Sequence, residues 1–378
     1  MSTIHYLTQI HIEFNAIQKL SDECQRLGIE RPLLITDQGV KAAGILAKAL
    51  AQIDEMDLIV FDQTPSNPTE LSVRQAAHLY TEHRCDGLIA VGGGSSLDCA
   101  KAVAILATHP GPLKTYATIE GGTSRITAAV APLIAIPTTS GTGSEVARGA
   151  IIILDDGRKV GFHSWFLMPK VAICDPLLTL SLPPLLTAAT GMDAIAHCME
   201  TFMAAPFNLP ADGIALDGLT RAWTHIEKAT QDGRDQNARL QMMSASMQGA
   251  MAFQKGLGCV HSLSHSLGGI NPKLHHGTLN AMFLPSVIQF NQSASSVIED
   301  HRILRIAKAI GLTSADDVAP AITAMNQRLG LPSGLKALGV RQDQFPQIIE
   351  GALNDHCHLM NPRIADAADY ENMLHESM

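Results

Sequence analysis

Four side chains in the middle of the chain have the types and the spacing to bind one divalent cation. Asp193 and His197 stand four residues apart, so on a helix they lie on one face. His261 and His265 repeat this spacing, and His276 follows after a short turn. The set Asp193, His197, His261 and His276 would supply one carboxylate and three imidazoles, which suits Fe(II), Zn or Mn. The sequence therefore predicts a metal-dependent enzyme.

The cluster holds more imidazoles than one cation needs, and a chain with 16 histidines contains some chance pairs. His275 directly precedes His276 and is an alternative ligand. Any one of these histidines by itself is more often a surface or core residue than a ligand. Asp193 favours a metal, because its helix neighbours, such as Met192 and Ile195, are apolar, and a buried carboxylate needs a cation or a hydrogen-bonded partner.

Composition excludes several classes of protein. A chain of 378 residues with 46% hydrophobic residues suits two domains with separate cores. The net charge of −9, without any Lys/Arg run, argues against a nucleic-acid partner. No stretch approaches the roughly 18 apolar residues of a membrane span, and the N-terminus lacks a signal pattern. Seven cysteines without a Cys-x-x-Cys pair favour reduced thiols, so we expect a cytoplasmic protein without a membrane partner.

The first half of the chain alternates short apolar runs with helix-period segments, which is typical of βα units that build a parallel sheet. We expect strands at 32–37, 57–61, 87–91 and 132–136, and helices at 40–53, 69–83 and 97–106. The content of β-branched residues drops after 171–175. From residue 185 onward the pattern is nearly all helical. The boundary near Leu182 therefore predicts an α/β domain over 1–182 and an all-α domain over 183–378.

Two polar loops follow predicted strands and indicate a nucleotide. The run Gly92 to Ser96 joins a buried strand to a helix, where backbone N–H groups can approach phosphate oxygens. Alone this signal is weak, because it lacks the G-x-G-x-x-G spacing. A second, hydroxyl-rich loop from Thr138 to Ser144 follows a neighbouring strand. Asp37, after the first strand, would bind an adenosine ribose and repel a 2′-phosphate, which points to NAD, although a helix N-cap is an equal alternative.

These motifs together resemble the iron-containing, or group III, alcohol dehydrogenases. The matching segments run nearly end to end: 65–69, 91–101, 137–145, 190–200, 260–269, 276–281 and 361–363. The resemblance implies a Rossmann-like NAD domain with a parallel sheet, followed by a helical metal domain, in a homodimer or larger homo-oligomer. It is the architecture that dehydroquinate synthase also has. Residues expected around NAD are Asp37, Asn67, Gly93, Gly94, Ser95, Thr138, Thr139, Thr142 and Lys159.

By the same resemblance, Asp193, His197, His261 and His276 hold Fe(II), with Zn as an alternative, and His265 faces the substrate. The chain departs from the family pattern at one of these positions. The family has a single His-Gly ten residues after the substrate histidine, whereas here His275 stands ten and His276 eleven residues after His265. We favour His276 because it precedes the sequence Gly-Thr-Leu-Asn-Ala, as the family's ligand does.

The implied reaction is hydride transfer between NAD(H) and a short-chain alcohol or aldehyde, with the cation as Lewis acid and His265 as proton relay. Similarity is greatest to the members that interconvert 4-hydroxybutyrate and succinate semialdehyde, for whose carboxylate we consider Arg148, Lys255 and His358. The alternatives are lactaldehyde with 1,2-propanediol, or a general primary alcohol. A cyclising lyase is a remote alternative, because the metal domain lacks clustered Lys/Arg for a phosphorylated substrate.

Overall fold

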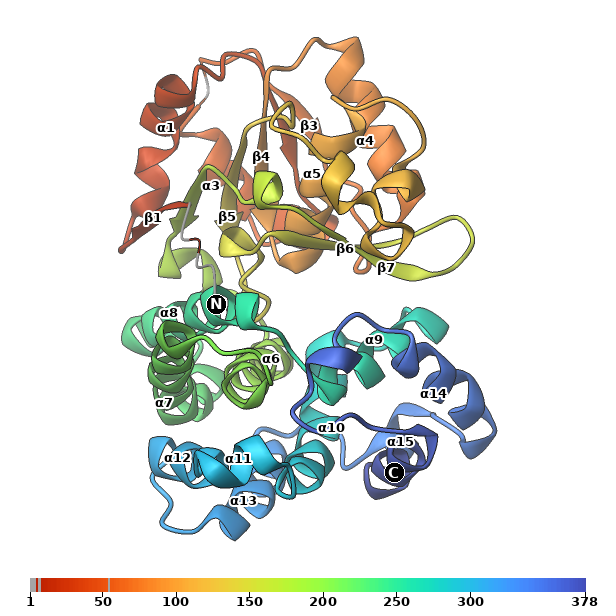
Figure 1. Ribbon diagram of the computed structural model, residues 1–378. Coiled ribbons are helices and arrows are strands. Elements are labelled where there is room, and N and C mark those ends of the chain that lie inside the picture. Colours follow the sequence, from red (N-terminus) through yellow and green to blue (C-terminus); the bar gives the residue numbers. More distant parts are fainter. Residues whose placement is uncertain (1–4, 6–7, 54) are drawn as a thin grey trace. The chain divides into compact units, whose positions relative to one another are not determined.

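The computed structural model describes residues 5, 8–53 and 55–378 and divides into two compact units (Figure 1). The α/β unit comprises His5–Thr139 and Gly143–Ser181. The helical unit comprises Ser140–Thr142 and Leu182–Met378. The expected fold class, a parallel-sheet unit followed by a helical unit, is confirmed.

The α/β unit is built on a six-stranded sheet with the order β1-β8-β5-β4-β2-β3, in which all neighbours are parallel. The strands are β1 (Gln9–Ile12), β2 (Pro32–Ile35), β3 (Ile59–Phe61), β4 (Gly87–Gly92), β5 (Leu133–Pro137) and β8 (Val171–Cys174). Four of them, β2, β3, β4 and β5, lie where the alternation predicted strands, and β8 coincides with the β-branched run at 171–175, which was not assigned as a strand. The edge strand β1 was missed, because two polar residues interrupt its apolar pattern and it gains its place only by pairing with β8.

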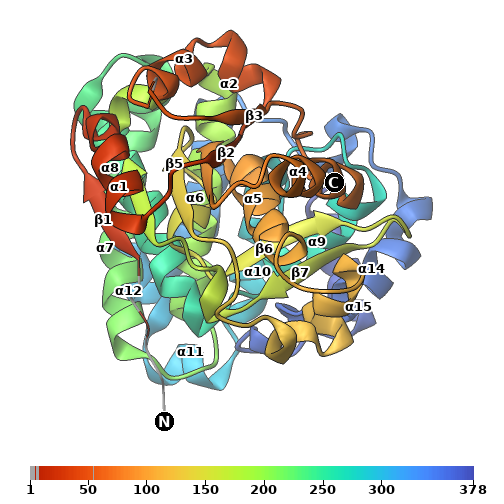
Figure 2. The same cartoon turned by 90° about the horizontal axis from the view of Figure 1, so that it is seen from above.

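Alternate residues of the central strands point to opposite faces of the sheet, and helices cover both faces. The helices are α1 (Leu20–Leu27), α2 (Gln38–Ala42), α3 (Ile45–Leu50), α4 (Glu70–Glu82) and α5 (Gly94–Leu106). Figure 2 shows α1 and α3 on one side of β2 and α4 and α5 on the other. In β2, Leu33 and Ile35 join a core with residues of α4 and α5, whereas Leu34 joins a second core with residues of α1 and α3. A single helix over 40–53 was wrong, because Gly44 adopts a left-handed conformation with φ 74° and separates α2 from α3.

A β-hairpin that the sequence did not predict follows the loop after β5. Its strands β6 (Gly149–Ile153) and β7 (Lys159–His163) pair antiparallel. Ile152, Val160 and Phe162 join the same core as α4 and α5, while Lys159 lies on the opposite, half-buried face of the hairpin. The hairpin therefore connects a predicted cofactor residue rigidly to the sheet.

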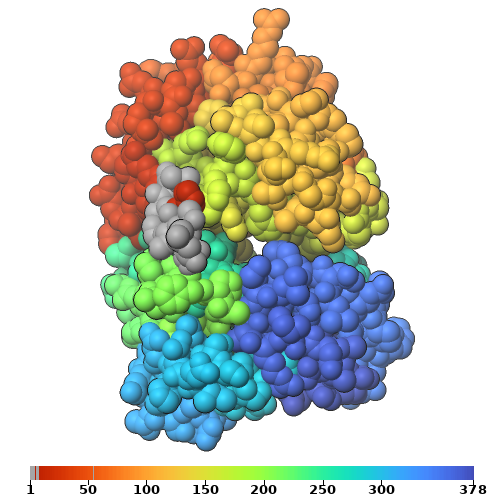
Figure 3. Space-filling view, in the orientation of Figure 1, coloured from red at the N-terminus to blue at the C-terminus, as the bar shows by residue number. Residues whose placement is uncertain are grey.

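The helical unit surrounds a long, almost wholly buried helix, α6. The helices are α6 (Pro184–Met203), α7 (Leu209–Gln231), α8 (Gln236–Ala252), α9 (Cys259–Ile270), α10 (His276–Asn291), α11 (Ser295–Glu299), α12 (Arg302–Ala309), α13 (Val318–Arg328), α14 (Phe345–Leu353) and α15 (Ala367–Glu376). α7, α8 and α10 pack against α6, and α14 packs against α9. The C-terminal part of the chain, blue in Figure 3, forms part of the surface of this unit. In the described residues, no helix has the length and apolar character of a membrane span.

Candidate metal centre and cofactor loops

The order of the strands creates a topological switch point between β2 and β4. After β2 the chain continues into β3 on one side, whereas after β4 it continues into β5 on the opposite side. In open parallel sheets, ligands bind outside the carboxyl ends of the strands at such a point. Asp37 follows β2 here, and the glycine-rich turn follows β4 at Gly92. The predicted cofactor residues thus begin where this topology binds ligands.

Asp37 makes two hydrogen bonds at the switch point. Its Oδ1 accepts from the backbone N–H of Val40 at 2.9 Å and caps α2, which is one of the two roles that the local sequence allowed. Its Oδ2 accepts from the hydroxyl of Ser96 at 3.1 Å, which joins the end of β2 to the start of α5. The carboxylate is therefore held from both sides, and its contact with a ribose stays a prediction.

Glycines allow the turns after β4 and β5 to approach each other closely. A Cβ at Gly92 would lie 2.4 Å from Oγ of Ser96, and a Cβ at Gly93 would lie 3.2 Å from Oγ1 of Thr139. The N–H of Thr138 donates to the carbonyl of Gly92 at 3.0 Å. These contacts bring both predicted loops into one place at the edge of the sheet.

The remaining predicted cofactor residues of the α/β unit lie around the start of α5. Gly94 is its first residue, and the first N–H groups of a helix have no intrahelical partners, so they favour anions. The hydroxyl of Ser95 donates to the carbonyl of Ser66. The adjacent Asn67 accepts through Oδ1 from Nζ of Lys159 on β7 at 2.9 Å. Residues distant in sequence are thus joined into one polar group.

A buried ionic network fastens the loop after β5 to α5, and the sequence analysis assigned its members no role. Nζ of Lys101 donates to Oγ of Ser144 at 2.8 Å and to three backbone carbonyls at 2.7–2.8 Å. Asp98, one turn earlier, accepts from the hydroxyl of Ser144 at 2.7 Å. Burial lowers the pKa of Lys101 to about 8 and raises the pKa of Glu145 to about 7. The sequence signal for this network was the pair Asp98 and Lys101, an acid and a base three residues apart in an otherwise apolar helix.

Thr142, the remaining predicted cofactor residue, lies in the segment 140–142, which groups with the helical unit.

The four predicted metal ligands meet in the helical unit. Asp193 and His197 lie on α6, His261 on α9, and His276 begins α10. The Nε2 atoms of these histidines lie 3.8, 3.9 and 3.6 Å, respectively, from Oδ1 of Asp193. Ligand atoms around a tetrahedral zinc-like centre would be separated by about 3.4 Å. His275, the alternative ligand, is exposed at the N-cap of α10, so the structure favours His276.

In all three imidazoles Nδ1 faces an oxygen atom, which leaves Nε2 for a metal. The contacts are His197 with the Gly141 carbonyl at 3.2 Å, His261 with the Glu200 carboxylate, and His276 with the Ser264 hydroxyl at 3.4 Å. Metal-binding histidines generally have such a partner on the second nitrogen, because it fixes the tautomer and the ring orientation.

Asn280 marks the point where the acceptor atoms converge. Its Nδ2 lies 2.7 Å from Oδ1 of Asp193, 3.2 Å from Nε2 of His261 and 3.1 Å from Nε2 of His276. Its own Oδ1 is buried and has no hydrogen-bond partner among the described residues. Lone pairs that converge in this way on one buried point, one of them from a carboxylate, suit a cation. The residues therefore fit a divalent metal ion.

Glu200 lies on α6 with Asp193 and His197 and contacts the predicted metal ligand His261. The sequence analysis assigned it no role. Burial raises the pKa of Glu200 to about 8, although the N–H of Val260, which donates to it at 2.8 Å, acts in the opposite direction. Burial also lowers the pKa of its partner His261 well below the usual value. Glu200 follows Asp193 by seven residues and His197 by three, so all three share one helix face, and this spacing was an available signal.

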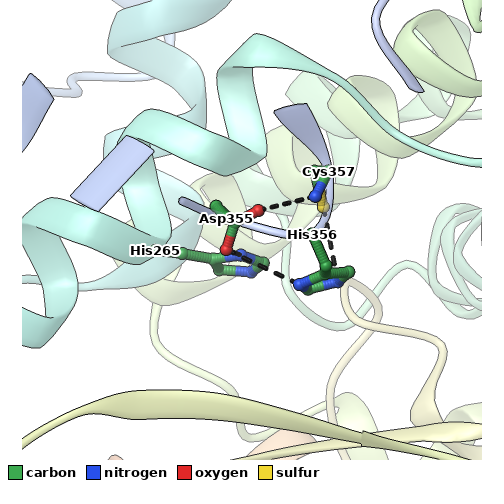
Figure 4. A group of neighbouring side chains, drawn as sticks. All are labelled: His265, Asp355, His356 and Cys357. Carbon is green, nitrogen blue, oxygen red and sulfur yellow. Dashed lines mark hydrogen bonds and ion pairs between the residues drawn. The ribbon is translucent and has the colours of Figure 1, made fainter. Parts of the chain in front are cut away.

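His265 lies beside the metal ligands and is oriented by a carboxylate. Its ring stacks on His276 with centroids 5.4 Å apart. Its Nδ1 lies 3.0 Å from Oδ2 of Asp355, and Figure 4 shows these two side chains next to each other. The backbone N–H of Cys357 donates to the other carboxylate oxygen at 2.8 Å. Burial by itself would raise the pKa of Asp355, but the facing His265 and His356 lower it well below the usual value. Asp355 was also missed, because it is 90 residues from His265 in the chain.

Two of the three cations considered for a substrate carboxylate are already engaged. Nζ of Lys255 forms a buried ion pair with Asp212 at 2.5 Å. Nδ1 of His358 lies 2.9 Å from the hydroxyl of Tyr370, and burial lowers the pKa of this imidazole. Arg148 belongs to the α/β unit, where its guanidinium lies 4.5 Å from the centroid of an indole ring. In the described part of the chain, no acidic side chain lies within ion-pair distance of Arg148, which makes it the remaining candidate.

Comparison with protein families gives two matches that together span nearly the whole chain. Residues 8–176 match the model described as iron-containing alcohol dehydrogenase. Residues 187–378 match the model of the C-terminal part of the Fe-containing alcohol dehydrogenase family.

Individual relatives cover the chain over its full length or nearly so. It is 64% identical to the 4-hydroxybutyrate dehydrogenase of Cupriavidus necator over 100% of both chains. It is 36% identical to the 1,3-propanediol dehydrogenase of Klebsiella pneumoniae, with 92% of each chain covered. Among solved structures, a 1,3-propanediol oxidoreductase superposes with a TM-score of 0.93 at 33% identity, covering 100% of both chains.

Proposed function

The chain belongs to the iron-containing alcohol dehydrogenase family, and from this premise we propose that it interconverts 4-hydroxybutyrate and succinate semialdehyde with NAD(H). The observation that carries the substrate is the 64% identity, over the full length of both chains, to a 4-hydroxybutyrate dehydrogenase. The relatives reported above are dehydrogenases or oxidoreductases by name. They favour hydride transfer over the cyclising lyase.

We propose that residues 1–182 bind the dinucleotide. The switch point of the sheet supports this assignment, since Asp37, the glycine turn and Lys159 with Asn67 gather in the same unit. The negative charge of Asp37 favours a ribose 2′-hydroxyl over a 2′-phosphate, which supports NAD rather than NADP. Thr142, in the segment that groups with the helical unit, is also proposed as a cofactor residue.

We propose that residues 183–378 hold the metal and the substrate, with Asp193, His197, His261 and His276 as ligands. When bound, Fe(II), or Zn in its place, would act as a Lewis acid on the substrate oxygen. When ionised, Glu200 would accept the Nδ1–H of His261 and so leave Nε2 available as a ligand atom.

His265 is proposed to move the hydroxyl proton. Asp355 accepts the Nδ1–H of His265, which places the ring lone pair on Nε2. NAD, when bound, would supply the acceptor for the hydride of the alcohol, and His265 would take the hydroxyl proton on Nε2. The stacking of His265 on His276 keeps this atom beside the ligand cluster. Asp355 does not itself meet the substrate in this scheme and serves to orient the histidine.

Arg148 is proposed to attract the carboxylate of the substrate. It is partly desolvated, which lowers the pKa of its guanidinium, and it has no acidic partner among the described residues. An anionic substrate would supply the missing counter-charge. Replacement of Arg148 by Met should raise KM for succinate semialdehyde and leave KM for butanal nearly unchanged.

A second candidate reaction has specific support. The full-length superposition on a 1,3-propanediol oxidoreductase, together with 36% identity to a 1,3-propanediol dehydrogenase, favours a neutral diol and its aldehyde. This reaction would use the same metal centre and the same histidine, and its substrate differs in carrying a neutral hydroxyl in place of the carboxylate.

The test is NADH oxidation by anaerobically purified, Fe(II)-loaded protein with succinate semialdehyde, lactaldehyde and butanal. We expect the highest kcat/KM for succinate semialdehyde and loss of turnover with a chelator or in Asp193→Asn. A preference for a neutral aldehyde would overturn the substrate. Turnover that survives both chelation and Asp193→Asn would overturn the metal mechanism.

We also propose that the protein works in the cytoplasm as a homodimer or larger homo-oligomer. The seven free and buried cysteines support a reducing compartment. Light scattering coupled to size-exclusion chromatography measures the oligomeric state, and a monomer at micromolar concentration would contradict it.

A further inference from the structure

A second cluster of metal-binding side chains lies beside the first, on the outer side of His265. His265 comes from α9, and Asp355, His356 and Cys357 come from the segment after α14 (Figure 4). Each can contribute one ligand atom such that all four atoms lie within 4.8 Å of one another. The rings of His265 and His356 stack with centroids 5.5 Å apart. Two imidazoles, a carboxylate and a thiol are the ligand types that zinc takes in proteins.

The separations in the cluster are close to those of a tetrahedral site. Nδ1 of His265 lies 3.0 Å from Oδ2 of Asp355, and Nδ1 of His356 lies 3.6 Å from the same oxygen. Sγ of Cys357 lies 3.5 Å from Nε2 of His356. With zinc-to-ligand distances of about 2.1 Å for nitrogen or oxygen and about 2.3 Å for sulfur, neighbouring ligand atoms would be separated by about 3.4–3.6 Å. Only one ring nitrogen of His356 can bind the same ion, so the site would close by adjustment of side chains whose ligand atoms already lie within 4.8 Å of one another.

The charge of the cluster favours a cation. Asp355 is the acidic member, and its ion-pair partners among the described residues are the two imidazoles of His265 and His356, without lysine or arginine. The side chain of His356 is 37% exposed and gives access from solvent, whereas Cys357 is buried. Burial raises the pKa of the Cys357 thiol well above the usual value, so it is protonated until a metal displaces the proton.

We infer that His265, Asp355, His356 and Cys357 form a second divalent-cation site that binds zinc and, when filled, inhibits the enzyme. Binding forms a zinc–sulfur bond and releases the Cys357 proton to solvent. It also takes Nδ1 of His265, whose proton moves by way of solvent to Nε2, so that the ring stays a neutral imidazole, loses its hydrogen bond to Asp355 and no longer has a free lone pair. His265 then lacks the orientation proposed for proton transfer. The inhibitory part of this inference rests on the proposed function, and the metal site itself does not.

Sulfur distinguishes the two sites spectroscopically, because the set Asp193, His197, His261 and His276 contains none. Co²⁺ added to the Fe(II)-loaded enzyme under anaerobic conditions should produce a thiolate-to-cobalt charge-transfer band in the near ultraviolet. The band should saturate at one equivalent and disappear in Cys357→Ser. In the matched control Cys24→Ser, which removes a buried thiol of the α/β unit, it should persist. Absence of the band in the wild-type protein, or its persistence in Cys357→Ser, would overturn the site.

Inhibition is measured separately with Zn²⁺ on the Fe(II)-loaded enzyme, while released iron is quantified to detect exchange at the first site. Wild-type NADH oxidation should fall without stoichiometric iron release. His356→Asn removes one ligand at the surface and should need at least about tenfold more Zn²⁺ for the same inhibition. If the enzyme kept full activity at Zn²⁺ concentrations that replace Co²⁺ and abolish the cobalt band, the inhibitory role would be overturned, whereas the inference of the metal site would stand. If the protein turned over no aldehyde, the proposed function would fail, and the cobalt band would still decide the site.

Discussion

Replacement of Glu200 by Gln tests whether metal binding depends on the hydrogen bond between Glu200 and His261. In the native protein one carboxylate oxygen accepts from the N–H of Val260 and the other faces Nδ1 of His261 within hydrogen-bond distance. A glutamine has a single oxygen. If that oxygen stays on Val260, the amide N–H₂ faces His261 and favours the tautomer with hydrogen on Nε2, which cannot bind a metal.

The expected loss can be estimated from this geometry. Orienting partners of metal-bound histidines contribute about 10- to 100-fold to metal affinity, which corresponds to about 1.4–2.7 kcal/mol. We therefore expect the dissociation constant for Fe(II) to rise by about 10- to 100-fold. At saturating Fe(II), kcat should change much less, because the four ligands and His265 are all present.

The assay is anaerobic competition for Fe(II) between the protein and a chelator of known affinity, followed by kcat at saturating metal. Glu145→Gln is a matched control, since Glu145 is equally buried, at 2% exposure, but lies in the α/β unit. An unchanged dissociation constant in a folded Glu200→Gln protein would refute the assigned role of Glu200. A large loss of kcat at saturating metal would place Glu200 in the chemical step instead.

Four further outcomes are expected. His276→Ala should abolish Fe(II) binding, whereas His275→Ala should retain it, as measured by metal content after dialysis; the opposite result would exchange the two assignments. Asp355→Asn should keep its metal but lose about 10²- to 10⁴-fold in kcat, on the scale of the loss when a histidine is held in the wrong tautomer, and retained kcat would contradict the orienting role. Asp37→Ser should raise kcat/KM for NADPH relative to NADH, and an unchanged ratio would remove the ribose contact. Burial raises the pKa of Glu145 from 4.5 to about 7, so between these pH values the folded state binds more protons than the unfolded state. The free energy of unfolding of the α/β unit should therefore fall by up to about 3 kcal/mol as pH rises through this range. Glu145→Gln should remove this fall, measured by urea unfolding with Trp165 fluorescence in a Trp223→Phe background, and an unchanged dependence of the unfolding free energy on pH would contradict the role of Glu145.

Local spacing was enough to place the residues that share one element. Asp193 and His197 were predicted on one helix face, and α6 puts both on the same buried face. Gly93 was predicted at a strand-to-helix turn and caps α5. Helix and strand periodicity sets the direction of side chains a few residues apart, so such pairs can be read from the sequence without knowledge of the fold. The metal-ligand types and the α/β-to-helical order followed from the same short-range patterns.

Tertiary packing decided which residues of separate helices and strands come into contact. The proposal of His276 rather than His275 rests on the start of α10, where Nε2 of His276 lies 3.6 Å from Oδ1 of Asp193 and His275 is exposed at the N-cap. The partnership of Asp355 with His265 joins α9 to the segment after α14. Likewise, Lys255 became unavailable to a substrate only through its ion pair with Asp212, 43 residues away. These contacts arise from burial of distant segments against each other, and neither spacing nor residue type along the chain encodes their geometry directly.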